Sequence, residues 1–335
     1  MRKICPKIVV VLIICLIAGL FMGCGDSNLT KVRLNEVTHS IFYTPMYVAI
    51  NLGYFAEEGL EIELTNGGGA DKVMTAVLSG QADIGFMGPE ATVYVYNEGK
   101  EDYVINFCQL TKRDGSFLVA REPDPNFSWD KVKGKTIIGG RKGGMPEMCL
   151  EYVLKNHGII PNQDVEVQTN VQFDLMAGAF AGGEADYVAL FEPVATTMER
   201  EGKGHIVAYI GADSGEVPYT VFSAKKSYIE KNPEIIQKFT NAIYKGQLWV
   251  QNHSAEEIVE AIASSFPDTS EEELLPVVRR YRDNDAWAKS PIFTAESFDR
   301  LQDILQMAGE LSKKAPYEKL VTNEFAEKAM SEIKG

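Results

Sequence analysis

The pattern of hydrophobic and polar positions divides the chain into short strands separated by longer helices. Runs such as Leu60–Thr65 and Asp83–Met87 have the length and apolar content of strands, and the stretches between them carry helical periodicity. Strands that alternate with helices predict a mainly parallel sheet with helices on both faces, so the fold class is α/β. The predicted strands cover residues 31–37, 60–65, 83–87, 103–110, 136–139, 165–169, 187–190 and 205–210.

Several predicted helices carry start signals. Thr44 is expected to cap a helix that has Pro45 at its first position and ends at Gly59. Further along the chain, a serine three residues before a glutamate has the spacing of a capping box. This spacing predicts two later helix starts, at the pairs Ser254/Glu257 and Ser270/Glu273.

Two stretches of the chain repeat the same arrangement of residues. Met74–Lys100 and Met176–Lys203 share Met, Gly, Ala-Asp and Glu-Gly-Lys at matching places, with one inserted residue near Gly182. Each stretch predicts a helix, a tight turn, a short apolar strand, a polar loop and a second helix. A unit that recurs about a hundred residues later predicts two similar α/β lobes facing each other across a cleft.

The chain is long enough for two domains of ordinary size, and two segments are expected to cross between them. Arg113–Gly115 leads into the second lobe, and Tyr219–Lys225 leads back. The rest of the chain is helical and is expected to pack on the first lobe. We therefore predict two doubly wound lobes joined by two crossover strands. Lobe one comprises residues 31–114 and 222–335, and lobe two comprises residues 115–221.

The first residues have the character of a secretion signal. Residues 1–23 combine a basic start with the apolar run Ile8–Met22, which is shorter than a membrane-spanning helix. The run ends in Gly23-Cys24, which resembles a bacterial lipobox, and the polar residues 24–30 would form a tether. We predict a protein anchored outside the cytoplasm through a lipid on Cys24. An ordinary signal peptide and an uncleaved anchor are the alternatives.

Cysteine usage is consistent with an exported protein whose lobes move. Once the signal residues and Cys24 are set aside, only Cys108 and Cys149 remain. A disulfide between them would tie the two lobes together, so buried free thiols are expected.

Composition and motif content argue against nucleic-acid binding and against catalysis. The 47 acidic and 33 basic residues give a net charge of −14, and an acidic surface repels phosphate backbones. Gly134-Lys135-Thr136 is no phosphate-binding P-loop, because the first glycine of that motif would fall at Trp129. The histidines and body thiols show no metal-ligand spacing, and no hydrolase motif occurs. The sequence predicts a monomer that is not an enzyme and uses no cofactor or metal.

The loops at the carboxyl ends of the strands form the predicted site, because small molecules bind there in doubly wound sheets. For Glu90 and Glu192, each beside a proline after a strand, capping of the following helix is the alternative role. Their recurrence in both repeats favours ligand binding. The predicted loops are residues 38–43, 67–69 and 88–90 in lobe one and 141–145, 171–173 and 191–193 in lobe two, with Asp114 and Tyr219 added from the crossovers.

Three segments resemble the substrate-binding proteins of ABC importers for nitrate, sulfonates, taurine and thiamine-type pyrimidine precursors. They are YTPMYVAINLGYFAEEGLEIEL, LSGQADIGFMGPEA and VKGKTIIGGRKGGMPE, and the resemblance covers essentially the whole mature chain. It implies a type II periplasmic-binding-protein fold, capture of a small molecule in the cleft, and delivery to a membrane permease with a cytoplasmic ATPase. The complete set of predicted ligand-binding residues is His39, Phe42, Tyr43, Gly69, Glu90, Asp114, Gly144, Met145, Phe191, Glu192 and Tyr219.

The start of one predicted lobe-two helix departs from the pattern of the anion binders in this family. Those proteins tend to present hydroxyls there, whereas Gly143–Pro146 has none and Pro146 lacks an N–H donor. Carboxylates in the cleft disfavour an anion but can accept hydrogen bonds from an aminopyrimidine stacked on aromatic rings. The residues therefore favour a nitrogen heterocycle such as a thiamine precursor. A small anion becomes the better fit if Arg141 or Lys142 points inward.

Two further functions stay open as alternatives to an importer subunit. One is a pyrimidine-synthesising enzyme of the same fold, which would need a reactive cluster of histidines or cysteines. The other is a surface sensor or adhesin, in which closure of the lobes signals to a partner.

Overall fold

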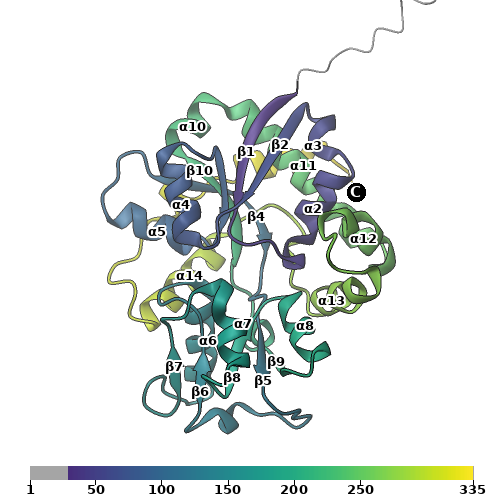
Figure 1. The fold of residues 1–335 in the computed structure, drawn as a ribbon. Coiled ribbons are helices and arrows are strands. Elements are labelled where there is room, and N and C mark those ends of the chain that lie inside the picture. The colour runs from purple at the N-terminus through teal and green to yellow at the C-terminus, as the bar shows by residue number, and fades with distance from the viewer. Residues whose placement is uncertain (1–28, 335) are drawn as a thin grey trace, which may run out of the picture.

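The computed structural model describes residues 29–334 as two lobes, each built on one β-sheet with helices around it (Figure 1). The predicted signal peptide 1–23, Cys24 and most of the predicted tether 24–30 lie outside the described residues. Within residues 29–334, every helix is too short or too polar to cross a membrane.

The first sheet has five strands, and its strand order is β2-β1-β3-β10-β4. Strand β1 pairs in parallel with β2 and β3, whereas β10 runs antiparallel to β3 and β4. β10 enters this sheet directly from the other lobe, so it does not share the direction of strands that follow a crossover helix. The strands are β1 (Thr30–Glu36), β2 (Leu60–Asn66), β3 (Ile84–Met87), β4 (Val104–Thr111) and β10 (Thr220–Lys225).

The second sheet also has five strands, in the order β7-β6-β8-β5-β9. The antiparallel strand β5 was not predicted, because Phe117–Ala120 is a short, fully buried apolar run without alternation. β5 and β10 each run antiparallel to both of their neighbours, so both sheets are mixed. The other four strands of each sheet run in one direction, so the prediction of mainly parallel sheets is confirmed apart from this one strand. The strands are β5 (Phe117–Ala120), β6 (Thr136–Ile138), β7 (Glu166–Gln168), β8 (Tyr187–Leu190) and β9 (His205–Tyr209).

The helices of lobe one begin where the sequence indicated, with one correction. The single helix predicted from Thr44 to Gly59 is two helices, because Gly53 adopts a φ of 79° between them. Thr44 is not a cap: it is the first helical residue, and its hydroxyl donates to the Ile41 carbonyl. Ser40 instead caps the short 3₁₀ turn that precedes the helix. The helices are α2 (Thr44–Asn51), α3 (Tyr54–Glu57), α4 (Ala70–Ser79) and α5 (Glu90–Asn97).

The C-terminal part of the chain is helical and returns to lobe one, as predicted (Figure 1). The long helix α11 packs against α2, α16 and β4. Both predicted capping boxes are present, at Ser254 and at Ser270. The helices are α10 (Lys226–Lys231), α11 (Pro233–Asn252), α12 (Ala255–Ile262), α13 (Glu271–Asp283), α14 (Ala295–Met307), α15 (Tyr317–Leu320) and α16 (Glu324–Glu332).

The predicted internal repeat is confirmed in the order of elements. Lobe one contains α4, β3 and α5 in succession, and lobe two contains α7, β8 and α8. Each unit places a glutamate at the turn after its strand, Glu90 after β3 and Glu192 after β8. The helices of lobe two are α6 (Met145–Asn156), α7 (Met176–Ala181), α8 (Val194–Arg200) and α9 (Ile210–Ser214).

Helix α13 reaches from lobe one to lobe two on one side of the cleft. The Tyr281 hydroxyl donates to the Gly115 carbonyl (2.9 Å) and accepts from the Glu192 N–H (3.2 Å). The adjacent Arg280 forms an ion pair with the buried Glu192 carboxylate. The Ser40 hydroxyl also donates to the Glu192 carbonyl, at 2.7 Å. Buried hydrogen bonds therefore connect the two lobes here.

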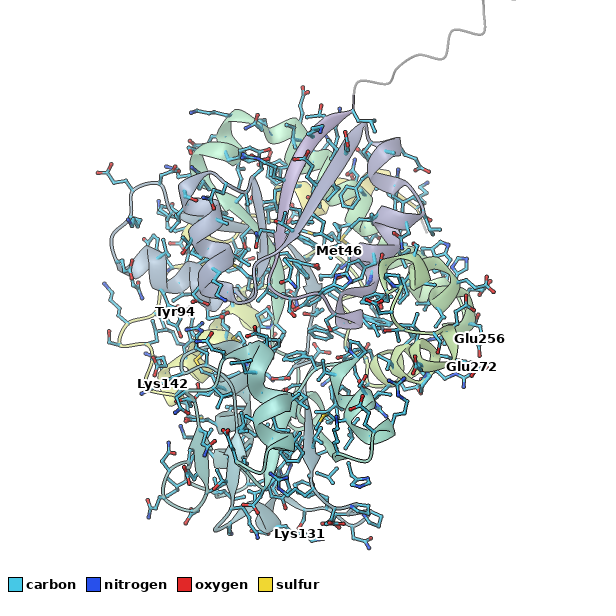
Figure 2. The ribbon with its side chains drawn as sticks, viewed as in Figure 1. Met46, Tyr94, Lys131, Lys142, Glu256 and Glu272 are labelled. Carbon is cyan, nitrogen blue, oxygen red and sulfur yellow. The ribbon has the colours of Figure 1, made fainter. Side chains whose placement is uncertain are left out.

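The other side of the cleft is connected by the loop that follows β6. Figure 2 shows Tyr94 and Lys142 close together at this edge, with Glu272 of α13 at the opposite edge. The Tyr94 hydroxyl donates to the Gly143 carbonyl (3.1 Å), and Lys142 Nζ lies 3.5 Å from Glu310 Oε1. The lobes thus touch on both sides of the cleft.

Close packing of α11 on α2 gives a test of the fold. In α11, a Cβ added to Gly246 would lie 2.3 Å from the Pro45 carbonyl oxygen. Alanine is normally the better helix residue by about 1 kcal/mol. We nevertheless expect Gly246→Ala to lower the free energy of unfolding by about 1–3 kcal/mol, through overpacking. Gly178→Ala in α7 is the control, because nothing lies within 4 Å of its added Cβ. Urea unfolding measures both, and equal effects would contradict the packing described.

Candidate functional site

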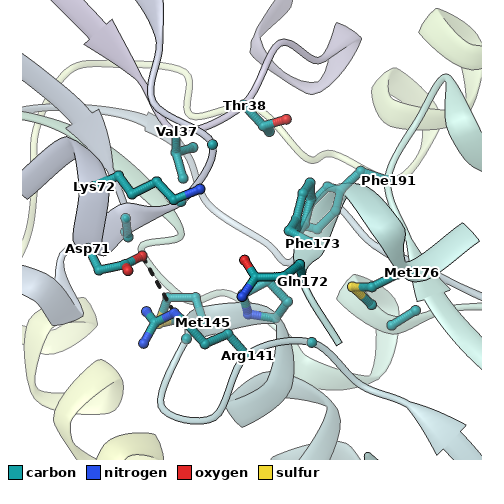
Figure 3. Close-up of a pocket in the computed structure, with 18 of the residues that line it drawn as sticks. Val37, Thr38, Asp71, Lys72, Arg141, Met145, Gln172, Phe173, Met176 and Phe191 are labelled. Carbon is teal, nitrogen blue, oxygen red and sulfur yellow. Dashed lines mark ion pairs between the residues drawn. The ribbon is translucent and has the colours of Figure 1, made fainter. Parts of the chain in front are cut away.

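A cavity of about 370 Å³ lies between the two lobes (Figure 3). Lobe one contributes the loops that follow β1, β2 and β3, and lobe two contributes the loops that follow β6, β7 and β8. The cavity therefore occupies the edge where open α/β sheets bind small molecules. Its volume suits one small ligand.

Aromatic side chains form one wall of this cavity. Tyr43, Phe191 and Tyr219 are buried in the structure yet line the cavity, and Phe173 joins them from the loop after β7. The Phe173 and Phe191 ring centroids are 5.7 Å apart. Phe42 lies behind this wall, where it contacts the rings of Tyr43, Phe191 and Tyr219 at 5.4–6.0 Å. Such a wall can hold a flat ring by stacking or edge contacts.

Glu90 supplies a buried acidic group. It is the first residue of α5, lines the cavity and is only 1% exposed. Burial raises the pKa of its carboxyl to about 7, although the Arg141 charge and backbone N–H groups, including that of Met145, oppose the rise. Gly88 makes room for this carboxyl, since a Cβ there would lie 2.0 Å from Glu90 Oε2. That oxygen is buried and has no hydrogen-bond partner among residues 29–334.

Charged side chains from both lobes gather at the mouth of the cavity. Asp71 and Lys72 come from the first turn of α4, and Arg141 comes from the loop after β6. Arg141 Nε lies 3.6 Å from Asp71 Oδ1, and both side chains are about half exposed (48% and 56%). Figure 3 shows these residues at one end of the cavity and the rings of Phe173 and Phe191 at the other. Solvent screens this cross-lobe pair, so it contributes little stability.

Asp114 lies behind the cavity wall at the crossover between the lobes. Its Oδ1 accepts hydrogen bonds from the Ser116 N–H (2.6 Å) and hydroxyl (2.5 Å). Burial raises the pKa of the Asp114 carboxyl to about 7, against the effect of these bonds. The Tyr219 hydroxyl, close to Asp114, lacks a partner among the residues that the structure describes. Asp114 does not line the cavity itself, whereas the neighbouring Tyr219 does.

His39 and Glu192 lie outside the cavity. His39 Nδ1 is 2.9 Å from Glu36 Oε1, and this hydrogen bond raises the pKa of the His39 imidazole. The Glu192 carboxylate accepts from the Thr196 N–H (2.8 Å) and forms the ion pair with Arg280. Burial raises the pKa of Glu192, and Arg280 opposes the rise. Glu192 therefore has the contacts of the helix-capping alternative.

The structure brings seven of the eleven predicted residues to one cavity, and their contact with a ligand stays a prediction. The seven are Tyr43, Gly69, Glu90, Gly144, Met145, Phe191 and Tyr219. The four outside the cavity are His39, Phe42, Asp114 and Glu192.

Sequence reasoning missed three polar residues that line the cavity, two of them charged residues at its mouth. Asp71, Lys72 and Asn170 line the cavity but were not proposed. Asp71 and Lys72 follow the glycines 67–69 directly, so the strand-end rule would have found them if it had been extended by one helical turn. Arg141, proposed to point inward only as an alternative, does line the cavity, whereas Lys142 pairs with Glu310 outside it.

Comparison with known proteins identifies the family. The model of the NMT1/THI5-like family matches residues 41–257. YtlA of Bacillus subtilis (strain 168), which carries the description of a binding protein, is 49% identical over 307 residues and 92% of each chain.

Two solved structures show the same fold at low sequence identity. The alkanesulfonate-binding protein SsuA from Xanthomonas axonopodis pv. citri, bound to MOPS, has a TM-score of 0.71 at 15% identity, over 88% of this chain and 98% of its own. The periplasmic nitrate-binding protein NrtA from Synechocystis PCC 6803 has a TM-score of 0.70 at 14% identity, over 91% of this chain and 89% of its own. The named relatives are binding proteins rather than enzymes. The fold is that of periplasmic binding proteins, and the chain belongs to the NMT1/THI5-like family.

Proposed function

We propose that this protein is the solute-binding component of an ABC importer. It holds a small molecule in the cavity between its lobes, leaves it chemically unchanged, and passes it to a membrane permease with a cytoplasmic ATPase. The cavity at the strand ends, the family and the binding proteins among its relatives support this role. The lipobox supports attachment to the outer face of the membrane through Cys24.

The observation that carries the choice of ligand is the unpartnered Glu90 oxygen in an aromatic cavity. A buried carboxylate oxygen without a hydrogen bond is costly, so a ligand that supplies a donor to this group gains affinity. Rings such as Phe173 and Phe191 favour a flat molecule between or against them. We therefore assign the ligand to the nitrogen heterocycles that carry an amino group, of which the aminopyrimidine precursor of thiamine is one.

A small anion is the second candidate for the ligand, because Arg141 lines the cavity. Glu90 opposes this candidate, since an anion placed near it must leave the carboxyl protonated. Calorimetric titration of the purified protein with hydroxymethyl aminopyrimidine, benzenesulfonate and nitrate separates the two. The proposed role requires saturable binding of one compound and its recovery unchanged by mass spectrometry. Steady conversion of any of these compounds would overturn it.

The first prediction concerns affinity. Glu90→Gln should weaken binding of hydroxymethyl aminopyrimidine by about 1–3 kcal/mol, or roughly fivefold to 150-fold, because the amide is a weaker acceptor than the carboxylate. Glu98→Gln, an exposed position at the other end of α5, is the matched control and should bind as the unaltered protein does. Equal affinity of both variants in the same titration would exclude Glu90 from the ligand contacts.

The second prediction concerns stability and pH. The pKa of Glu90 rises from 4.5 in the unfolded chain to about 7 in the folded one, so the folded state loses relative stability as pH climbs through this window. Glu90→Gln should therefore stabilise the ligand-free protein at pH 8, by on the order of 2–3 kcal/mol. The gain should become small below about pH 4, where the carboxyl is protonated in both states. Urea unfolding at both pH values measures it, and a gain that does not depend on pH would contradict the assignment.

A further inference from the structure

Two cations from opposite lobes face the mouth of the cavity. Lys72 comes from the first turn of α4, and Arg141 comes from the loop after β6. Figure 3 shows the Lys72 side chain extended over the cavity and Arg141 beside Asp71. With two cations and one carboxylate, these three residues give the mouth a net positive charge.

The base of the cavity has the opposite sign. Glu90 is only 1% exposed, whereas the side chain of Arg141 is 48% exposed, so charge changes sign with depth. No ion pair joins Glu90 to Arg141 within the described part of the chain, where Arg141 pairs with Asp71 instead. The buried acid and the outer cations are thus available to different groups of one ligand.

Uncharged side chains line the cavity as well as charged ones. The Phe173 and Phe191 rings lie at the end away from the charged residues, and Gln172 lies between the two groups (Figure 3). An aromatic wall beside a separated pair of opposite charges matches a ring that carries two polar substituents.

We propose, given a solute-binding function, that the ligand is a bipolar ring compound. Its amino or protonated nitrogen meets Glu90 at the base, and an acidic substituent, such as a carboxylate, sulfonate or phosphate, lies between Lys72 and Arg141 at the mouth. A ligand with only the amine leaves the outer cations without an anion. A ligand with only the acid leaves the buried carboxyl without a donor.

The charge pattern also sets the orientation of the ligand, with its acidic end at the mouth of the cavity and its amino end at the base. The acidic substituent bridges the lobes at the mouth, because Lys72 belongs to lobe one and Arg141 to lobe two. Contact of one anion with both cations favours the arrangement in which the lobes lie together, because each lobe supplies one of the two side chains.

A matched panel of ring compounds tests the proposal on the full chain. Benzylamine carries the amine alone, benzoate carries the acid alone, and para-aminomethylbenzoate carries both; amino and acidic pyridines extend each class. The two-group class should give the largest rise in melting temperature and bind at least about tenfold more tightly than either single-group class.

Two variants assign the ends of the ligand. Lys72→Gln should lower affinity for para-aminomethylbenzoate about tenfold and leave that for benzylamine unchanged. Glu90→Gln should lower affinity for both amines. Lys100→Gln, an exposed lysine outside the cavity, is the control and should change neither.

The outcomes separate this proposal from the broader function. If one of the single-group classes binds as tightly as the two-group class, or if Lys72→Gln affects benzylamine and para-aminomethylbenzoate alike, the bipolar ligand is excluded while solute binding stands. If no class raises the melting temperature and a compound in the panel is instead converted, both the bipolar ligand and the solute-binding role fail.

Discussion

Desolvation of one carboxyl group is the constraint around which the cavity is organised. Glu90 is buried by both lobes: α5 of lobe one carries it, and the start of α6 in lobe two, at Met145, lies against it. Removing a carboxylate from water costs free energy, and the raised pKa of Glu90 expresses that cost. The cost is largest when the lobes meet. A donor in the cavity offsets part of that cost, so a ligand that carries one favours the arrangement in which the lobes are together.

The rigid surroundings of the cavity come from residues that do not line it. Phe42 supports three of the aromatic rings, and its carbonyl accepts a hydrogen bond from Trp287 Nε1 at 2.8 Å. Trp287 follows α13, so the C-terminal segment holds the loop that carries Phe42 in lobe one in place. Tyr281 in α13 contacts the crossover at Gly115. The helical portion thus positions the wall as well as covering the first sheet.

Local sequence patterns predicted the parts of the fold and the site that depend on local physics. Strand ends follow from apolar runs and glycine turns, and these placed Tyr43, Gly69 and Glu90 at the correct edge of the sheet. The parts that the sequence did not predict correctly depend on contacts with residues far away in the chain. Strand β5 has no pattern of its own and is defined by pairing with β8 and β9. His39 contacts Ser265, more than two hundred residues away, and no local signal indicates that contact.

The two repeats show how one position acquired different environments. Glu90 and Glu192 both follow a buried strand and stand beside a proline, but in opposite order. Glu90 begins its helix and projects over Gly88 into the cavity, whereas Glu192 precedes its helix and accepts from Thr196. Arg280 then neutralises Glu192, because α13 reaches lobe two and places this arginine beside the carboxylate. Glu192 therefore helps to connect the two lobes, whereas Glu90 remains available to a ligand in the cavity.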